Sequence, residues 1–460
     1  MFTLMVVAMI AMVALAAGAA QPMKVADPKD RQIVDGFLEQ VAEVPARITP
    51  AHCRAMAEED SDETEAMTWR VMPYLRMPLT AYQLTGDPKY LDIFVQVFDN
   101  MRSALTVGPD GFLGWYGKVE PESVDPSDTE RKVDAVISSF SATETVCNFL
   151  SVIATDETLS KKYAEQRAEY LDLIVNHLVK KHDVRGDYVD MGEAGAIYRM
   201  PAQGFRPDLI RLTMPHNKHS IIVRGLLALY RVTGDDEYMK KAAKIGTRFK
   251  RSLTLKDGHY EWNYWDPAGA WDVSVLSPAR WKHWIGPEHR GGYYASSLEQ
   301  ALVLYDFGLV FDKTDMDRFL RTQLAMCWNG DAEHPQWSRV DGTRPPEYTQ
   351  GAYMASGLAP FSEKVASFVF SRAQQDYYLE HGGDNWTGGP VLNYWLREKL
   401  IDYPAAEGGK QTLIDLGRQF LAKPDNREFL KPLTFEVTLP GYQAPMAPSD
   451  AKRIFLEPKR

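Results

Sequence analysis

The segment 229–242 reads LYRVTGDDEYMKKA, and the segment 81–94 repeats its pattern as AYQLTGDPKYLDIF. In both, an apolar helical run ends at Thr-Gly, and glycine favours the left-handed conformation that closes a helix. An aspartate follows, Asp87 in one copy and Asp235 in the other, and aspartate is a preferred N-cap residue. Each segment therefore predicts two helices joined by a short turn.

Looser versions of this joint occur at 153–165 and 310–320. The helices that lead into the four joints start at regular intervals, near Glu65, Ser141, Lys218 and Gly292. The intervals are 76, 77 and 74 residues, and two further apolar helices start near Gly351 and Trp386. Repeated helical hairpins with long return loops predict an all-α fold, an (α/α)6 or (α/α)7 toroid whose inner helices all begin on one rim.

The ends of the 460-residue chain differ from this repeat. The first 20 residues are an apolar run followed by small residues, which is typical of a secretory signal peptide. An uncleaved anchor would need a longer span with basic flanks. We expect a secreted or periplasmic protein without a membrane span after signal removal, a catalytic toroid over residues 21–422, and a Pro-rich tail over 423–460 packed on it.

Composition narrows the class of ligand. A net charge of −10 argues against nucleic-acid binding, although a local cationic cluster can still bind an anion. Three scattered cysteines are too few for a disulfide scaffold or a cysteine metal site. The predicted inner helices begin with polar and aromatic residues. Because helix N-termini carry partial positive charge, their convergence would favour an anionic ligand.

The stretch 287–308, PEHRGGYYASSLEQALVLYDFG, gathers reactive side chains at the start of one such helix. His289 and Arg290 precede two glycines, and Tyr293 and Tyr294 follow in the first turn. Leu298 and later apolar residues continue an apolar stripe that includes Tyr294. A cavity at this point would contain an imidazole, a guanidinium and a phenol.

A second helix starts after Pro215 with His216, Asn217, Lys218 and His219. Three interpretations remain open for the two histidines: metal ligands, a structural pair at a helix start, or hydrogen-bond donors to a carboxylate together with Asn217. The metal interpretation lacks a third and fourth ligand, because the chain contains no HExxH motif or paired acidic motif.

The return loops are rich in aromatic residues, most densely over 260–284. Trp262 and Trp265 lie there beside Glu261. Aromatic faces with polar neighbours suit stacking on sugar rings, while packing inside the loop is the structural alternative.

These features resemble the toroid polysaccharide lyases that cleave uronic-acid polymers, with polysaccharide lyase family 38, which includes alginate and glucuronan lyases, as the nearest family. The resemblance rests on the predicted secreted toroid, on His-Asn-x-His at 216–219 and on His-Arg-Gly-Gly-Tyr-Tyr at 289–294. It implies a β-elimination in which a tyrosine acts as base and acid while Asn, His or Arg neutralises the uronate carboxylate. The order His216-Asn217 departs from the Asn-His order of several toroid lyases, which leaves open whether His216 or His219 is the matching histidine.

The resemblance implies catalytic roles for Tyr294, Tyr293, Arg290, His219, Asn217 and His216, with a slight preference for Tyr294 over Tyr293 as the base. It implies substrate contacts from Glu144, Trp262, Trp265, Glu261, Lys218, His289, Arg70 and Trp386. The expected partner is an anionic polysaccharide, and no metal or other cofactor is required, although some lyases use Ca²⁺.

Two other functions compete with the lyase. A toroid glycoside hydrolase would use two carboxylates, drawn from Glu144, Glu261, Asp266, Glu347 and Asp384. A surface glycan-binding protein would bind the same polymer without any reaction. The sequence leaves open which uronate is bound and whether cleavage is internal or terminal. It also leaves open whether deprotonation at C5 leads to elimination or epimerisation, and what the oligomeric state is.

Overall fold

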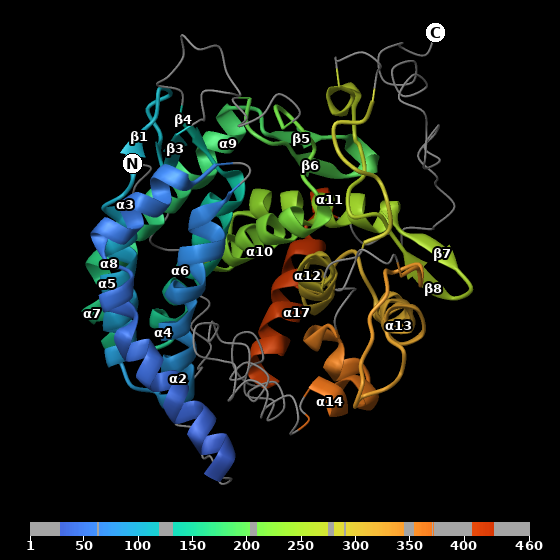
Figure 1. Ribbon diagram of the computed structural model, residues 1–460. Helices are drawn as coiled ribbons and strands as arrows, with labels where there is room; N and C mark the ends of the chain where they lie inside the picture. Colours follow the sequence, from blue (N-terminus) through green and yellow to red (C-terminus); the bar gives the residue numbers. More distant parts are fainter. Residues whose placement is uncertain are drawn as a thin grey trace.

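The computed structural model describes residues 28–61, 64–118, 132–202, 209–274, 280–288, 291–344, 354–369, 371 and 407–426. The α-helices are α2 (Pro28–Arg47), α3 (Pro50–Glu59), α4 (Met72–Thr85), α5 (Lys89–Arg102), α6 (Val136–Ile153), α7 (Glu157–Lys162), α8 (Ala164–Asp172), α9 (Lys180–Val184), α10 (His216–Thr233), α11 (Asp236–Ser252), α12 (Gly291–Asp306), α13 (Lys313–Arg321), α14 (Glu363–Val369) and α17 (Glu407–Ala422). Three π-helical segments, η2 (Met67–Val71), η4 (Leu173–Val179) and η7 (Thr322–Cys327), lie next to α4, α8 and α13. The chain is mostly helical, as the sequence predicts (Figure 1).

The predicted helix-turn-helix joints at Gly86 and Gly234 are confirmed, but the N-cap residue of α5 is Pro88 and not Asp87, whose side chain accepts a hydrogen bond from the backbone N–H of Lys89. Gly86 and Gly234 are in the left-handed conformation, with φ of 67° and 69°, and each donates its backbone N–H to the carbonyl four residues earlier. Asp235 caps α11 through a 3.0 Å hydrogen bond from the backbone N–H of Glu237. The helices α4 and α5, and α10 and α11, therefore fold back on each other as hairpins.

Short antiparallel hairpins occupy the return segments between the helical pairs. They are formed by β1 (Thr106–Val107) with β2 (Leu113–Gly114), β3 (Tyr116–Lys118) with β4 (Lys132–Asp134), β5 (Tyr188–Asp190) with β6 (Ala196–Tyr198), and β7 (Thr254–Lys256) with β8 (His259–Glu261). The sequence predicted long loops here and did not predict the paired strands.

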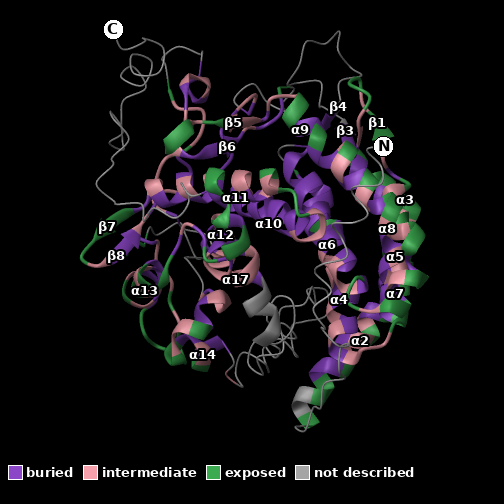
Figure 2. Ribbon diagram, turned by 180° about the vertical axis from the view of Figure 1, so that it is seen from behind, coloured by how far each residue is buried: buried purple, intermediate pink, exposed green. Residues whose placement is uncertain are grey.

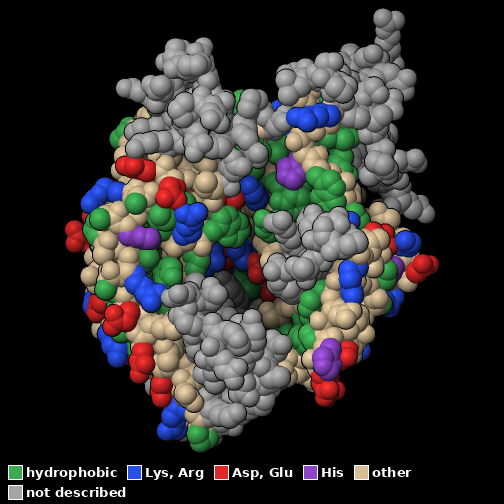
Figure 3. Space-filling view, in the orientation of Figure 1, with side chains coloured by type: hydrophobic (Ala, Val, Ile, Leu, Met, Phe, Trp, Pro, Cys, Tyr) green, Lys and Arg blue, Asp and Glu red, His purple; other side chains and the backbone are tan. Residues whose placement is uncertain are grey.

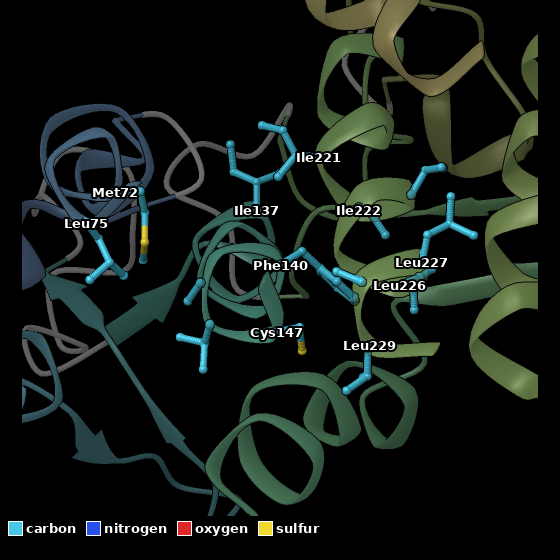
Figure 4. Packing of buried hydrophobic residues seen from close by; sticks show 14 of the residues in the cluster. Met72, Leu75, Ile137, Phe140, Cys147, Ile221, Ile222, Leu226, Leu227 and Leu229 are labelled. Carbon is cyan, nitrogen blue, oxygen red and sulfur yellow. The ribbon is translucent and has the colours of Figure 1, made fainter. Parts of the chain in front are cut away.

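The four helices α4, α6, α10 and α12 form one layer, in which each packs against the next in chain order. The contact between α6 and α10 is the closest, because Gly225 of α10 lies directly on the backbone carbonyl of Phe140 in α6. Figure 4 shows the Phe140 ring reaching towards Leu226 of α10. Both helices are almost completely buried (Figure 2).

Other helices cover this layer. The N-terminal helices α2 and α5 pack on α4, the segment α8–η4 packs on α6, and α11 packs on α10. Helix α17 lies against the end of α12, where Gly417 meets the backbone carbonyl of Phe307, and its Phe420 ring contacts Tyr230 at the end of α10. Within the described residues, α6 is the one helix long and apolar enough to cross a membrane, and 83% of that segment is buried inside the fold, so its apolar surface is used in packing.

Several expected features lie outside the described residues. These are the signal peptide over residues 1–20, the helix predicted near Trp386, and almost all of the tail over 423–460. The helix predicted to start near Gly351 is described from residue 354 on, where the chain forms the 3-10 segment η8 (Ser356–Phe361) and the short helix α14 in place of one long helix. The described part of the tail, Lys423–Asn426, lies against α11, because Lys423 and Asn426 both donate hydrogen bonds to Asp236.

Candidate functional site

The starts of α10 and α12 and of the segments leading into α4 and α6 converge at one end of the helical layer. Thr68 of η2 and Ser138 of α6 share a hydrogen bond of 3.0 Å. Glu65, just before η2, pairs with Lys218 in the first turn of α10 at 2.5 Å. On the other side of α10, the Ser296 hydroxyl of α12 donates to the backbone carbonyl of Asn217 at 3.1 Å. The starts of η2, α6 and α10 therefore meet one another, and the second turn of α12 contacts the start of α10.

The middles of the same four helices also meet. Glu144 of α6 pairs with Arg76 of α4 and with Arg224 of α10, both at 3.3 Å. Arg224 also pairs with Glu299 of α12. The helices α4, α6 and α10 run in parallel, because their starts contact starts and their middles contact middles. The middle of α12 contacts both the start and the middle of α10, since Gln300 donates to the His216 carbonyl at 3.2 Å and Glu299 pairs with Arg224. Figure 3 shows a hollow between α6, α10 and α12, with basic and acidic side chains inside it.

Two residues predicted for the site, His216 and Asn217, lie at the start of α10 in different surroundings. The His216 Nε2 atom lies 2.9 Å from Asp266 Oδ2, and Asn263 donates to the other Asp266 oxygen at 2.8 Å. Burial acts to raise the pKa of Asp266, but the hydrogen bond and charge of His216 outweigh it, so that the pKa is lowered. His216 is thus held in place by a buried carboxylate, as an oriented histidine in a site would be.

The Asn217 side chain is also buried, but its Oδ1 atom has no hydrogen-bond partner among the described residues. Buried polar atoms are nearly always paired, because leaving one unpaired costs about 1–3 kcal/mol. A half-turn of the amide exchanges Oδ1 and Nδ2, so this position can present either an acceptor or a donor. Asn217 is therefore suited to contact a ligand at the helix start.

His219 lies inside the core. Its Nε2 atom accepts a hydrogen bond of 2.9 Å from the backbone N–H of Tyr198, and burial lowers its pKa to about 3. The His219 ring is therefore neutral and packs between α10 and β6. Of the two histidines in the motif, only His216 is held at the helix start by a carboxylate.

The two tyrosines of α12 have opposite environments. Tyr294 is fully buried, stacks on Trp262 with ring centroids 5.7 Å apart, and has its pKa raised well above the usual value by burial. Tyr293 is only partly buried and stacks on Tyr264 at 5.4 Å. It precedes Ser296 by one turn, on the side of α12 that contacts the start of α10. This placement reverses the preference for Tyr294 and makes Tyr293 the better candidate.

The other predicted binding residues have structural partners. Trp262 packs on Tyr294, and Trp265 is buried with its indole N–H donated to the Thr213 carbonyl at 2.7 Å. Glu261, on the β7–β8 hairpin, pairs with His259 and Lys256. In this chain the dense aromatic loop is therefore mainly a core of its own.

The exposed Arg70 pairs with Glu59 at 2.5 Å, and Glu144 holds the two arginines described above. His289, Arg290 and Trp386 lie outside the described residues, as do Glu347 and Asp384.

A group next to Lys218, formed by Glu65 and Trp69, has no role predicted from the sequence. Glu65 also accepts a 2.9 Å hydrogen bond from the indole N–H of Trp69, whose ring is 45% exposed. Glu65 has a positive φ of 46°, which a residue other than glycine rarely adopts. The polar front of η2 was visible in the sequence, but its contact with α10 joins residues 153 positions apart and has no local signal.

No set of three or more His, Cys, Asp and Glu side chains in the described part of the chain is arranged to hold a metal ion. Comparison with known proteins found no family model, no curated protein and no solved structure that match the chain.

Proposed function

We propose that this chain is a secreted polysaccharide lyase that cleaves a uronic-acid polymer, such as glucuronan or alginate, by β-elimination. The observation that carries the proposal is the meeting of the helix starts that bear Tyr293, Asn217 and Lys218. These groups supply a phenol, an unpaired amide and a cation on neighbouring first turns.

The architecture that we infer is an (α/α) toroid. The layer formed by α4, α6, α10 and α12, covered by α5, α8–η4 and α11, corresponds to four inner helices of such a toroid with three outer helices. Of the two remaining inner helices, one would be that predicted near Trp386, and η8 with the short helix α14 occupies the chain position of the other. In this architecture every inner helix directs its positive N-terminal end towards the same rim, which favours an anionic substrate.

The reaction begins with removal of the proton from C5 of the uronate. The C–H electron pair forms the C4–C5 double bond, the bond between C4 and the glycosidic oxygen breaks, and that oxygen takes up a proton. Negative charge develops on the carboxylate during this step, so hydrogen-bond donors and cations around it stabilise the transition state.

We assign proton transfer to Tyr293 because it is the accessible tyrosine of the pair. Asn217 and Lys218 are the carboxylate-binding groups, and Asp266 orients His216 beside them. Tyr294 takes no part, since its burial disfavours the phenolate that a base requires. Arg290, the adjacent cation in the sequence, would lower the pKa of a neighbouring tyrosine.

The test is incubation of the purified protein with a panel of polyuronates, followed by the ultraviolet absorbance of the unsaturated product. We expect Tyr293→Phe to lower the rate by about 10²–10⁴-fold, the usual contribution of a general acid or base. Tyr294→Phe is the matched control and is expected to retain activity. Loss of activity in Tyr294→Phe with full activity in Tyr293→Phe would refute the assignment.

A glycoside hydrolase is the second candidate, and one observation favours it. Burial raises the pKa of both Asp60 and Glu65 in the segment before η2, although Lys218 opposes the shift at Glu65, and a raised pKa is what a general acid requires. New reducing ends without an unsaturated product would support the hydrolase. Binding without any product would support a glycan-binding protein, and altered uronate stereochemistry without cleavage would support an epimerase.

A further inference from the structure

Trp69 is one of two tryptophans among the described residues with a largely exposed ring, and its placement is unusual. It lies in η2, a π-helical segment, between the first turns of α6 and α10. π-Helical turns and strained backbone both occur preferentially at functional sites, and Glu65, four residues earlier, provides the strained backbone.

The ring is fixed through its edge, not through its faces. Its indole N–H donates to Glu65 Oε2 at 2.9 Å, while Glu65 Oε1 pairs with Lys218. No ring or cation from the described part of the chain stacks on Trp69. The indole is therefore held in one orientation at the rim, and 45% of the Trp69 residue is exposed to solvent.

Trp284, the other exposed tryptophan, provides a contrast. Its ring is 41% exposed, but the Arg339 guanidinium lies over it at 5.6 Å from the centroid, and Gly286 packs directly on its six-membered ring. Exposure alone therefore does not distinguish the two tryptophans, whereas the covering of the ring faces does.

We infer that Trp69 is a sugar-stacking platform that binds the apolar face of a pyranose ring next to the reacting residue of the polymer. This inference rests on the proposed function, since it makes Trp69 a neighbouring subsite of the same rim. The C–H groups on one face of a pyranose pack on an aromatic ring, while its hydroxyl groups remain free to bond polar neighbours. The Glu65–Lys218 pair connects this platform to α10, which also carries Asn217.

The experiment measures binding separately from catalysis. The purified wild-type protein and the variants Trp69→Ala, Trp69→Phe and Trp284→Ala are titrated with polyuronate oligosaccharides and with neutral oligosaccharides by calorimetry. We expect Trp69→Ala to weaken binding by about tenfold, from the loss of the apolar contact with one ring. Trp69→Phe retains an aromatic face and is expected to bind within about threefold of the wild type.

Trp284→Ala is the matched control because it removes the same side chain from a similarly exposed position. Equal losses in Trp69→Ala and Trp284→Ala, or no loss in Trp69→Ala, would overturn the inference. If Trp69→Ala leaves binding unchanged while the wild type makes unsaturated product, only the platform fails. If binding depends on Trp69 but no unsaturated product forms, the platform stands and the lyase proposal fails. Circular dichroism and the urea midpoint of each variant establish that the loss is not unfolding.

Discussion

The buried pair between Glu65 and Lys218 gives a quantitative test of how the helix starts are held together. The side chains are 4% and 12% exposed, with 2.5 Å between Glu65 Oε1 and Lys218 Nζ. Removing one partner of a buried pair leaves an uncompensated charge and costs about 3–5 kcal/mol. For Lys218→Met we expect the lower end, about 3 kcal/mol, because Trp69 still donates a hydrogen bond to the carboxylate.

The pH dependence of that loss has a definite sign. Burial raises the pKa of Glu65, and the charge of Lys218 limits the shift. In Lys218→Met the pKa therefore rises further, so the folded state binds a proton more readily than the unfolded chain does. The free energy of unfolding of the variant then recovers as the pH falls and Glu65 becomes neutral.

Urea unfolding followed by tryptophan fluorescence, at about pH 8 and about pH 5, measures both effects. The variant Glu65→Gln and the double variant complete the cycle. We expect the double variant to lose less stability than the two single variants together, by about 1–3 kcal/mol, because it leaves no buried charge behind. The reasoning is refuted if each single variant loses less than about 1 kcal/mol of unfolding free energy and the double variant loses the sum of the two. That result would show that the pair is solvated.

Further predictions concern packing, a second buried ion pair and the thiols. Gly225→Ala would place a Cβ atom 2.7 Å from the Phe140 carbonyl oxygen and is expected to destabilise the fold by about 1–3 kcal/mol. Gly36→Ala has no atom near the new methyl group and is expected to stabilise α2 by about 0.5–1 kcal/mol. The urea midpoints of the two variants check both expectations. Asp134→Asn leaves the buried Lys181 without its carboxylate partner and is expected to cost about 3–5 kcal/mol near neutral pH. Burial acts to raise the pKa of Asp134, but Lys181 and its neighbours lower it below the unfolded value, so this stability is lost as the pH falls and the variant should show a flatter acid limb. All three cysteine thiols are buried with raised pKa, so we expect a disulfide reagent to label them only after unfolding; rapid labelling of the native protein would contradict their placement.

The helical hairpins were predictable because their signals are local. A glycine after an apolar run and an aspartate after the glycine act within four residues, and both Gly234 and Asp235 do what the pattern predicts. The helix starts were less predictable, since α6 begins at Val136 and the sequence placed it near Ser141. Its first turn consists of buried apolar and small polar residues, which carry no strong N-terminal signal.

The orientation of the site residues was partly present in the sequence. Tyr294 belongs to the stripe that includes Leu298, and His219 stands four residues before the buried Val223, so the helical period places both on the buried face. The residues one or two positions away, Tyr293 and Asn217, fall on different sides of their helices. The period therefore separates Tyr293 from Tyr294, but it does not separate Asn217 from His219, because both are buried in α10.

The carboxylates at the rim show why residue type alone could not define the site. Helix starts that meet bring several positive dipole ends together, and buried acidic groups offset that charge. Asp60 accepts the backbone N–H of Met67 at the start of η2, Glu65 pairs with Lys218, and Asp266 holds His216. These acidic side chains serve the fold, whereas Asn217 Oδ1 in the first turn of α10 has no hydrogen-bond partner among the residues described. An anionic ligand would complete the same compensation from the solvent side, so its binding should raise the free energy of unfolding as well as occupy the site.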